Sequence, residues 1–253
     1  MGVTLFIPNW FLGLDVIFEC LFLIITAMIG YLSFKFYKLT KQNQNLHFAY
    51  AFFAIALSYL LKSGLNIAIY QRIHVGGEVY KVVRDVITLR QIGEFVQDAF
   101  MMSGLLIIIY LQAKNKDSHT FSLIAILTFI LAVITQGTQS ANYVVISVLL
   151  IYILCHCWRN YQSAPNRSKL YVLLGFAALT AGNILFCFVP LSYYFYITGH
   201  FAELIGYIML AVNLALVFSG KIIDKHAQTV STKIKPYISA KTKKGKKEND
   251  IKT

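Results

Sequence analysis

The sequence predicts an all-α, multi-pass membrane protein with a bundle of seven transmembrane helices. Of the 253 residues, 57% are hydrophobic and only 13% are charged, whereas a soluble domain carries about 25% charged residues. Seven apolar runs reach or approach the length of about 20 residues that a helix needs to cross a bilayer. Most basic residues fall on alternate connections between these runs. Lipid rather than water is therefore the expected solvent.

Short polar connections separate the seven runs, of which the fourth is the shortest. Together they form a transmembrane domain over residues 1–222, and residues 223–253 are expected to be a basic, disordered cytoplasmic tail. From Val79 to Ile92 the apolar residues keep helical spacing, which predicts either an interfacial helix or an outward extension of the third span. We place the spans at Phe11–Phe36, Phe48–Tyr70, Ile92–Gln112, Phe121–Thr135, Ala141–Trp158, Leu170–Pro190 and Phe201–Lys221.

The Lys and Arg residues predict the orientation. With the N-terminus outside, the inner segments carry eighteen of the 23 basic residues and the outer segments carry four. Cytoplasmic loops hold the excess of basic residues in membrane proteins, so the expected topology is N-out, C-in, in the cell membrane. Ten of the basic residues are lysines of the last 33 positions, which accounts for most of the net charge of +12 without a nucleic-acid site. This tail is expected to contact anionic lipid or a cytoplasmic protein.

The two halves of the chain show signs of an internal repeat. A shift of 121 residues aligns Tyr31 with Tyr152 and sets Asn183 opposite Lys62. The pattern predicts two parallel three-helix units joined by the fourth helix, a 3+1+3 arrangement like that of sugar-transporter-like membrane folds. Apolar helices also align by chance, so coincidence is the alternative.

Polar residues inside the spans are the main functional signal. Lys62 lies near the middle of the second span, where a lysine costs about 2.5–3.5 kcal/mol unless it faces polar groups or water. At a rise of about 1.5 Å per residue, Glu19, Asp98 and Asn183 fall within one helical turn of the depth of Lys62. Asn213, near the centre of the last span, is expected to hydrogen-bond to a neighbouring helix. Three acidic residues nearer the outer ends form a predicted rim: Asp15, Glu94 and Glu203.

The expected site is an outward-opening polar pocket with Lys62 near its floor and acidic residues at its rim. Lys62 can pair with Asp98 or Glu19, and a proton, a cation or an amine could balance the remaining negative charge. The predicted function is a sensor or receptor-like binding module for a small cationic or protonatable ligand. A transporter or channel for protons or cations is the second hypothesis. A Lys62–Asp98 salt bridge that serves only helix packing is the alternative without a site.

The sequence predicts no catalytic residues, no metal site and no cofactor. Cys155, His156 and Cys157 are consecutive, so on a helix they point in three directions, whereas structural zinc needs four converging ligands. The other histidines, His200 among them, fall at predicted span ends or in connections. Neither a phosphate-binding glycine pattern nor the G-x-S-x-G of serine hydrolases occurs. The chain is therefore not expected to be an enzyme.

The stretch from Phe36 to Lys62, FYKLTKQNQNLHFAYAFFAIALSYLLK, resembles the first inner loop and second helix of prokaryotic seven-helix sensor-type membrane modules. The resemblance covers about a tenth of the chain and implies a seven-helix scaffold of a sensory kind. It carries over no site residues. Such modules often precede a kinase or another output domain, so we expect any output here to pass through a partner.

Overall fold

The computed structural model describes residues 12–75, 79–112, 122, 125–130, 133 and 139–219. Over these ranges the chain is almost entirely helical and contains no strand. It divides into two compact units, Met1–Leu214 and Ala215–Thr253. The first unit contains the site described below. Of the second, residues 215–219 are described and are helical.

Six helices of the described residues are long and apolar enough to cross a membrane. The protein is therefore an all-α, multi-pass membrane protein. Residues 125–130 are also helical and belong to the fourth predicted span, most of the rest of which lies outside the described residues. The repeat and the N-out orientation stay predictions. The six helices are α1 (Leu12–Thr40), α2 (Asn43–Val75), α3 (Val79–Gln112), α5 (Gln139–Ser163), α6 (Arg167–Cys187) and the last helix, Tyr193–Ser219.

The helix bounds differ from the predicted spans, because hydropathy falls at polar residues while helical hydrogen bonding continues through them. The segment before the third span is part of one continuous helix, α3, so it is an extension of that span. The sixth span ends at Cys187, and Pro190 lies in the turn that follows. The last helix begins at Tyr193, eight residues before the predicted start at Phe201. The predicted start was wrong because the tyrosines, Thr198, Gly199 and His200 lower the hydropathy of the first two turns.

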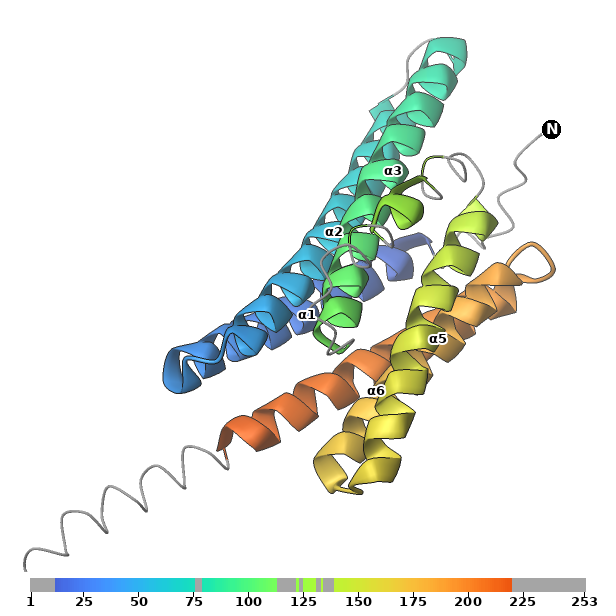
Figure 1. Ribbon diagram of the computed structural model, residues 1–253. Coiled ribbons are helices and arrows are strands. Elements are labelled where there is room, and N and C mark those ends of the chain that lie inside the picture. Colours follow the sequence, from blue (N-terminus) through green and yellow to red (C-terminus); the bar gives the residue numbers. More distant parts are fainter. Residues whose placement is uncertain are drawn as a thin grey trace, which may run out of the picture. The chain divides into compact units, whose positions relative to one another are not determined.

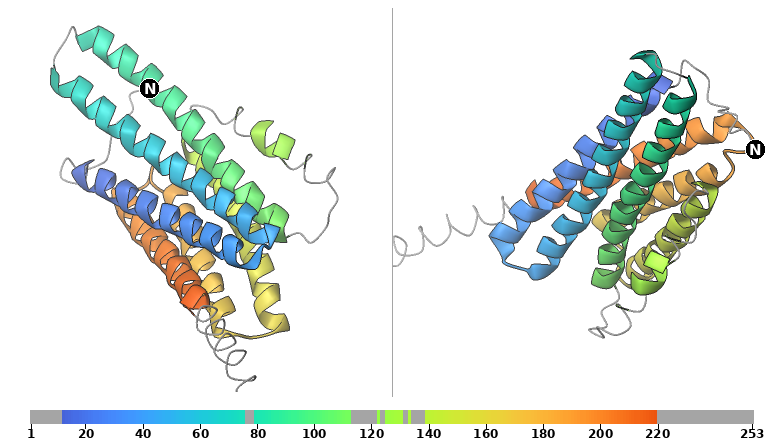
Figure 2. Two further views of the ribbon diagram at one scale, coloured as in Figure 1. Left: turned by 90° about the vertical axis from the view of Figure 1, so that its left-hand side faces the viewer. Right: turned by 90° about the horizontal axis from the view of Figure 1, so that it is seen from above.

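Helix packing leaves one apolar face of each helix inside and another outside. α2 packs against α1 and α3, and α5 packs against α6 and α3, as the ribbon views show (Figures 1 and 2). Large aromatic and aliphatic side chains such as Phe22, Phe52 and Phe176 are fully buried between the helices. Other large apolar side chains point outward, with Ile24 63% exposed and Val148 60% exposed. Such faces suit lipid contact, whereas water would penalise them.

α6 and the last helix approach each other at glycines. A Cβ atom on Gly182 would lie 2.8 Å from the backbone oxygen of Gly199, so only a hydrogen fits at this position. Small residues allow such close backbone contact between membrane helices. Nearer the other end of this helix pair, Ser168 Oγ donates a hydrogen bond of 2.7 Å to Asn213 Oδ1. The helix–helix hydrogen bond expected of Asn213 is therefore confirmed.

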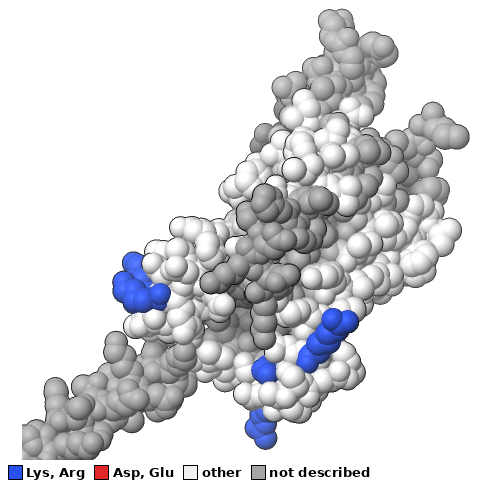
Figure 3. All heavy atoms as spheres, viewed as in Figure 1, with Lys and Arg blue, Asp and Glu red and all other residues white. Residues whose placement is uncertain are grey.

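The charges of α1 are separated along its length. Asp15 and Glu19 lie in its first turns, whereas Lys35 and Lys38 lie near its end. Further described basic residues surround the connection between α5 and α6, namely Arg159, Arg167 and Lys169. Figure 3 shows a face on which Lys and Arg side chains stand out, while no acidic side chain of the described residues is visible there. The acidic residues of the site are thus kept apart from the basic helix ends.

Candidate functional site

A buried ion pair joins α1 to α2. Lys62 Nζ lies 3.4 Å from Glu19 Oε1, and Asn66 Nδ2 donates hydrogen bonds of 2.8 and 3.0 Å to the two oxygens of the same carboxylate. The Glu19 side chain is fully buried, and that of Lys62 is 17% exposed. Asn66 follows Lys62 by four residues, so both side chains lie on the face of α2 toward α1. Of the two carboxylates expected as partners of Lys62, the structure places Glu19 in contact.

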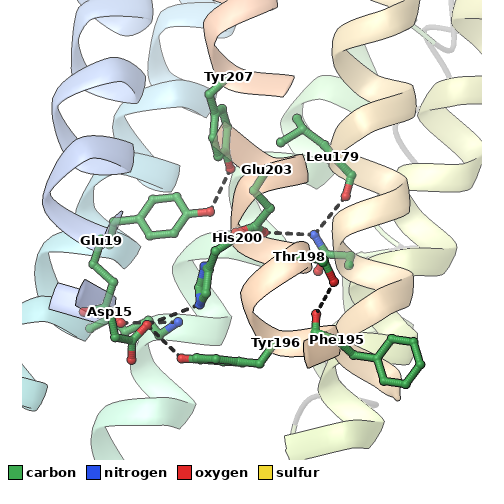
Figure 4. A network of polar contacts seen from close by, with 12 residues as sticks. Asp15, Glu19, Leu179, Phe195, Tyr196, Thr198, His200, Glu203 and Tyr207 are labelled. Carbon is green, nitrogen blue, oxygen red and sulfur yellow. Dashed lines mark hydrogen bonds and ion pairs between the residues drawn. The ribbon is translucent and has the colours of Figure 1, made fainter. Parts of the chain in front are cut away.

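A second polar group joins α1 to the last helix (Figure 4). Tyr196 Oη donates a hydrogen bond of 2.8 Å to Asp15 Oδ1, and His200 Nε2 lies 3.2 Å from the same oxygen. On the other side of the imidazole ring, His200 Nδ1 lies 3.7 Å from Glu203 Oε2. Asn183 Nδ2 of α6 donates a hydrogen bond of 3.2 Å to Glu203 Oε1. Asp15, His200 and Glu203 thus form a row that connects α1 through the last helix to α6.

Aromatic rings enclose His200, which is only 1% exposed. Phe18 and Phe22 of α1 stack with the imidazole at centroid distances of 5.7 and 5.8 Å. Phe186 and Tyr196 meet it in T-shaped contacts at 4.9 and 4.5 Å. The rings fix the orientation of the imidazole, so that its two nitrogens point toward the two carboxylates.

Asp98 of α3 contacts α5. Asn142 Nδ2 donates a hydrogen bond of 2.6 Å to Asp98 Oδ2, and Asp98 is 9% exposed. Lys62 and Glu94 act on Asp98 electrostatically, but the ion pair of Lys62 is formed with Glu19. Of the two partners expected for Lys62, the ion pair is thus formed with Glu19 of α1, while Asp98 of α3 is held by Asn142 of α5.

The layer of residues expected at the depth of Lys62 and the layer expected at the rim are in contact with each other in the structure. Asn183, expected at the depth of Lys62, contacts Glu203 of the predicted rim. Asp15 of the rim is one turn from Glu19 and is buried, at 8% exposure, while Glu94 is half-buried. The network therefore differs from the expected open pocket. Neighbouring side chains enclose the acidic groups, because hydrogen-bonding partners and aromatic rings fill the space between the helices.

A small cavity adjoins this network between five helices. Its polar lining groups are Asn183, which contacts Glu203 of the network, and Tyr207. Tyr207 Oη and Tyr59 Oη lie 3.0 Å apart within hydrogen-bonding distance. The cavity is mostly apolar, and its α2 residues lie on the side of Tyr59 away from Lys62. It is lined by Phe52, Ile55, Met101, Leu105, Ile108, Ile146, Leu150, Phe176, Leu179, Asn183 and Tyr207.

Four residues that contact the predicted site were not predicted from the sequence. Asn66 carried a signal, since it lies one helical turn from Lys62. His200 carried one as well, since it precedes Glu203 by three residues and so shares its helix face. It was not recognised because His200 was expected in the connection before the last span. Asn142 and Tyr196 are found only through the packing of their helices against α3 and α1.

The Cys155-His156-Cys157 triplet spreads around α5, with Cys155 exposed and Cys157 buried. Within the described ranges, no three His, Cys, Asp or Glu side chains are arranged to hold a metal ion.

Comparison of the chain with protein-family models, with curated proteins and with solved structures finds no match.

Proposed function

We propose that this membrane protein is a sensor or receptor-like binding module that takes up a proton or a small cation at its buried acidic network. One observation supports this most directly: among the residues that the structure describes, four buried carboxylates are faced by two basic side chains, Lys62 and His200. The four acidic residues, each no more than 9% exposed, are Asp15, Glu19, Asp98 and Glu203. Unbalanced charge within a membrane costs several kcal/mol, so binding of a positive species relieves the excess.

Binding of this kind changes contacts between helices. The α1 carboxylates hold α2 through Lys62 and the last helix through Tyr196 and His200. Each of these contacts depends on the charge of a carboxylate, so neutralisation weakens it. A ligand that binds one helix arrangement better than another shifts the population toward that arrangement. The shift would reach the other end of α1, at Lys35 and Lys38, where the predicted orientation places the cytoplasm and a partner protein.

A transporter or channel for protons or small cations is the second candidate. The observation that favours it is that the small cavity is lined both by Asn183, which hydrogen-bonds to Glu203, and by Tyr207 of the Tyr59–Tyr207 hydroxyl pair. Chains of polar groups inside membranes serve as proton relays. The apolar lining of the cavity would then act as a barrier that opens during transport.

Full-length protein reconstituted in liposomes separates the two candidates. Proton flux is followed with a trapped pH-sensitive dye, and binding of Na⁺ or methylammonium is measured by calorimetry together with proton uptake. Uptake or binding without flux, reduced by Asp98→Asn, supports the sensor. Flux that Asp98→Asn abolishes supports the transporter. Lys38→Gln, which alters one charge at the far end of α1, serves as the control and should behave as wild type. Folded protein with neither binding nor flux would overturn both candidates.

A further inference from the structure

We propose that His200 is a proton-binding residue that couples α1 to the last helix through Asp15 and Glu203. This inference rests on the proposed function and names the proton as the species that the network takes up. It assigns that role to a residue outside the site predicted from the sequence.

The geometry of the two carboxylates favours a protonated imidazole. His200 Nε2 lies 3.2 Å from Asp15 Oδ1, and His200 Nδ1 lies 3.7 Å from Glu203 Oε2. An imidazolium carries a hydrogen on both nitrogens and can serve both acceptors at once. A neutral imidazole carries one hydrogen and faces the second carboxylate with a lone pair. Loss of the proton therefore replaces one attractive contact with a repulsive one.

The surroundings of His200 strengthen the dependence on charge. Among the described residues, the carboxylates of Asp15 and Glu203 face the imidazole and favour its positive charge, and the Tyr196 ring meets it edge-on. The ammonium of Lys62 on α2 acts in the opposite direction. α6 contributes the ring of Phe186 at 4.9 Å. Aromatic faces also stabilise a desolvated cation, and Phe18 and Phe22 stack on the imidazole from α1. The protonated form is thus bound by α1 on one side and by its own helix on the other.

The proton therefore determines which helices are held together. In the protonated form, α1 is tied to the last helix through Asp15, and Glu203 connects that helix to Asn183 of α6. In the neutral form, one of the two carboxylates is released from the histidine. Histidine is the side chain whose unperturbed charge change falls between pH 5 and 8, which makes His200 the natural carrier of such a proton in this network.

Nitrogen-15 magnetic resonance of full-length, ¹⁵N-histidine-labelled protein in nanodiscs tests the proton site. His200 is identified by the signal lost in His200→Gln. Should that variant not fold, replacement of the five other histidines leaves His200 alone in the spectrum. We expect both ring nitrogens of His200 to change together in one transition between pH 4 and 9. Asp15→Asn and Glu203→Gln should each move this transition to lower pH. A His200 that keeps one protonation state from pH 4 to 9 would overturn the proposal.

Spin labels on exposed faces of the two helices, at Met28 of α1 and Ile208 of the last helix, test the coupling. The native cysteines are replaced first. The distance between the two labels should change by about 2 Å as His200 gains or loses its proton. Helix shifts in switching proteins lie in this range. His47→Gln removes an exposed histidine and should leave this shift unchanged. A constant distance while His200 titrates would also overturn the proposal.

The two experiments distinguish this inference from the proposed function. Proton uptake by a protein whose His200 does not titrate leaves the proposed function standing and refutes the role of His200. A titrating His200 with a coupled distance change supports the inference even where liposomes show no cation binding, because the resonance reads the proton directly.

Discussion

The Glu19–Lys62 ion pair should show strong energetic coupling in a double-mutant cycle. Lys62→Met keeps most of the length of the side chain and removes its charge. It leaves the fully buried carboxylate of Glu19 with hydrogen bonds from Asn66 alone. Loss of one partner from a buried pair costs about 3–5 kcal/mol, so we expect the free energy of unfolding to fall by about 3 kcal/mol.

Glu19→Gln should cost less, about 2 kcal/mol, because the Lys62 side chain is 17% exposed and its ammonium can be partly solvated. The double variant no longer holds an orphaned carboxylate, so its total loss should stay near 3 kcal/mol. The coupling energy is then about 2 kcal/mol, within the range of directly contacting residues.

The assay is unfolding of purified protein in mixed micelles, followed by circular dichroism as denaturing detergent is added. A parallel cycle of Lys62→Met with Asp98→Asn is the matched control. Asp98 hydrogen-bonds to Asn142, and the ion pair of Lys62 is formed with Glu19, so the Lys62–Asp98 coupling energy should stay below about 1 kcal/mol. Additive losses in the Glu19 cycle, or a larger coupling in the Asp98 cycle, would refute the assignment of the pair.

Two further predictions concern helix packing. Gly206→Ala places a Cβ atom 2.8 Å from the backbone oxygen of Gly175, so detergent unfolding should show a loss of about 1–3 kcal/mol. Gly64→Ala meets no atom within 4 Å and should be neutral or stabilise by up to about 1 kcal/mol. Equal losses of stability in Gly206→Ala and Gly64→Ala would argue against the close approach of Gly206 to Gly175. Tyr59→Phe removes the hydroxyl 3.0 Å from Tyr207 Oη and should cost about 1 kcal/mol, and no loss would indicate that the pair forms no hydrogen bond.

Much of the fold follows from the sequence, because lipid imposes simple rules on composition and length. An apolar run must become a helix in a bilayer, since its backbone groups have no other partners there. The bounds do not follow as well. α2 continues to Val75 through Gln71, Arg72 and His74, since helical hydrogen bonds do not end where hydropathy falls.

The candidate site follows from the sequence only in part. Depth along each span predicts that Glu19 and Lys62 lie close in height, and the structure places them in contact. Depth gives no rotation of a helix about its own axis, so it left Asp98 and Glu19 equally available to the lysine. The choice depends on which faces of α1, α2 and α3 meet. His200 was missed for another reason, since a helix start displaced by eight residues moved it out of the last span.

α2 and α3 are longer than the hydrocarbon layer is thick, so a small rotation of either helix would displace its end. With 33 and 34 residues, each rod measures about 50 Å, against a hydrocarbon thickness of about 30 Å. Val75 lies thirteen residues beyond Lys62, a lever arm of about 20 Å. A rotation of about 10° pivoting at the lysine would swing that end through about 3–4 Å. A change of one charge near Lys62 could thus move the Val75 end of α2 by about 3–4 Å.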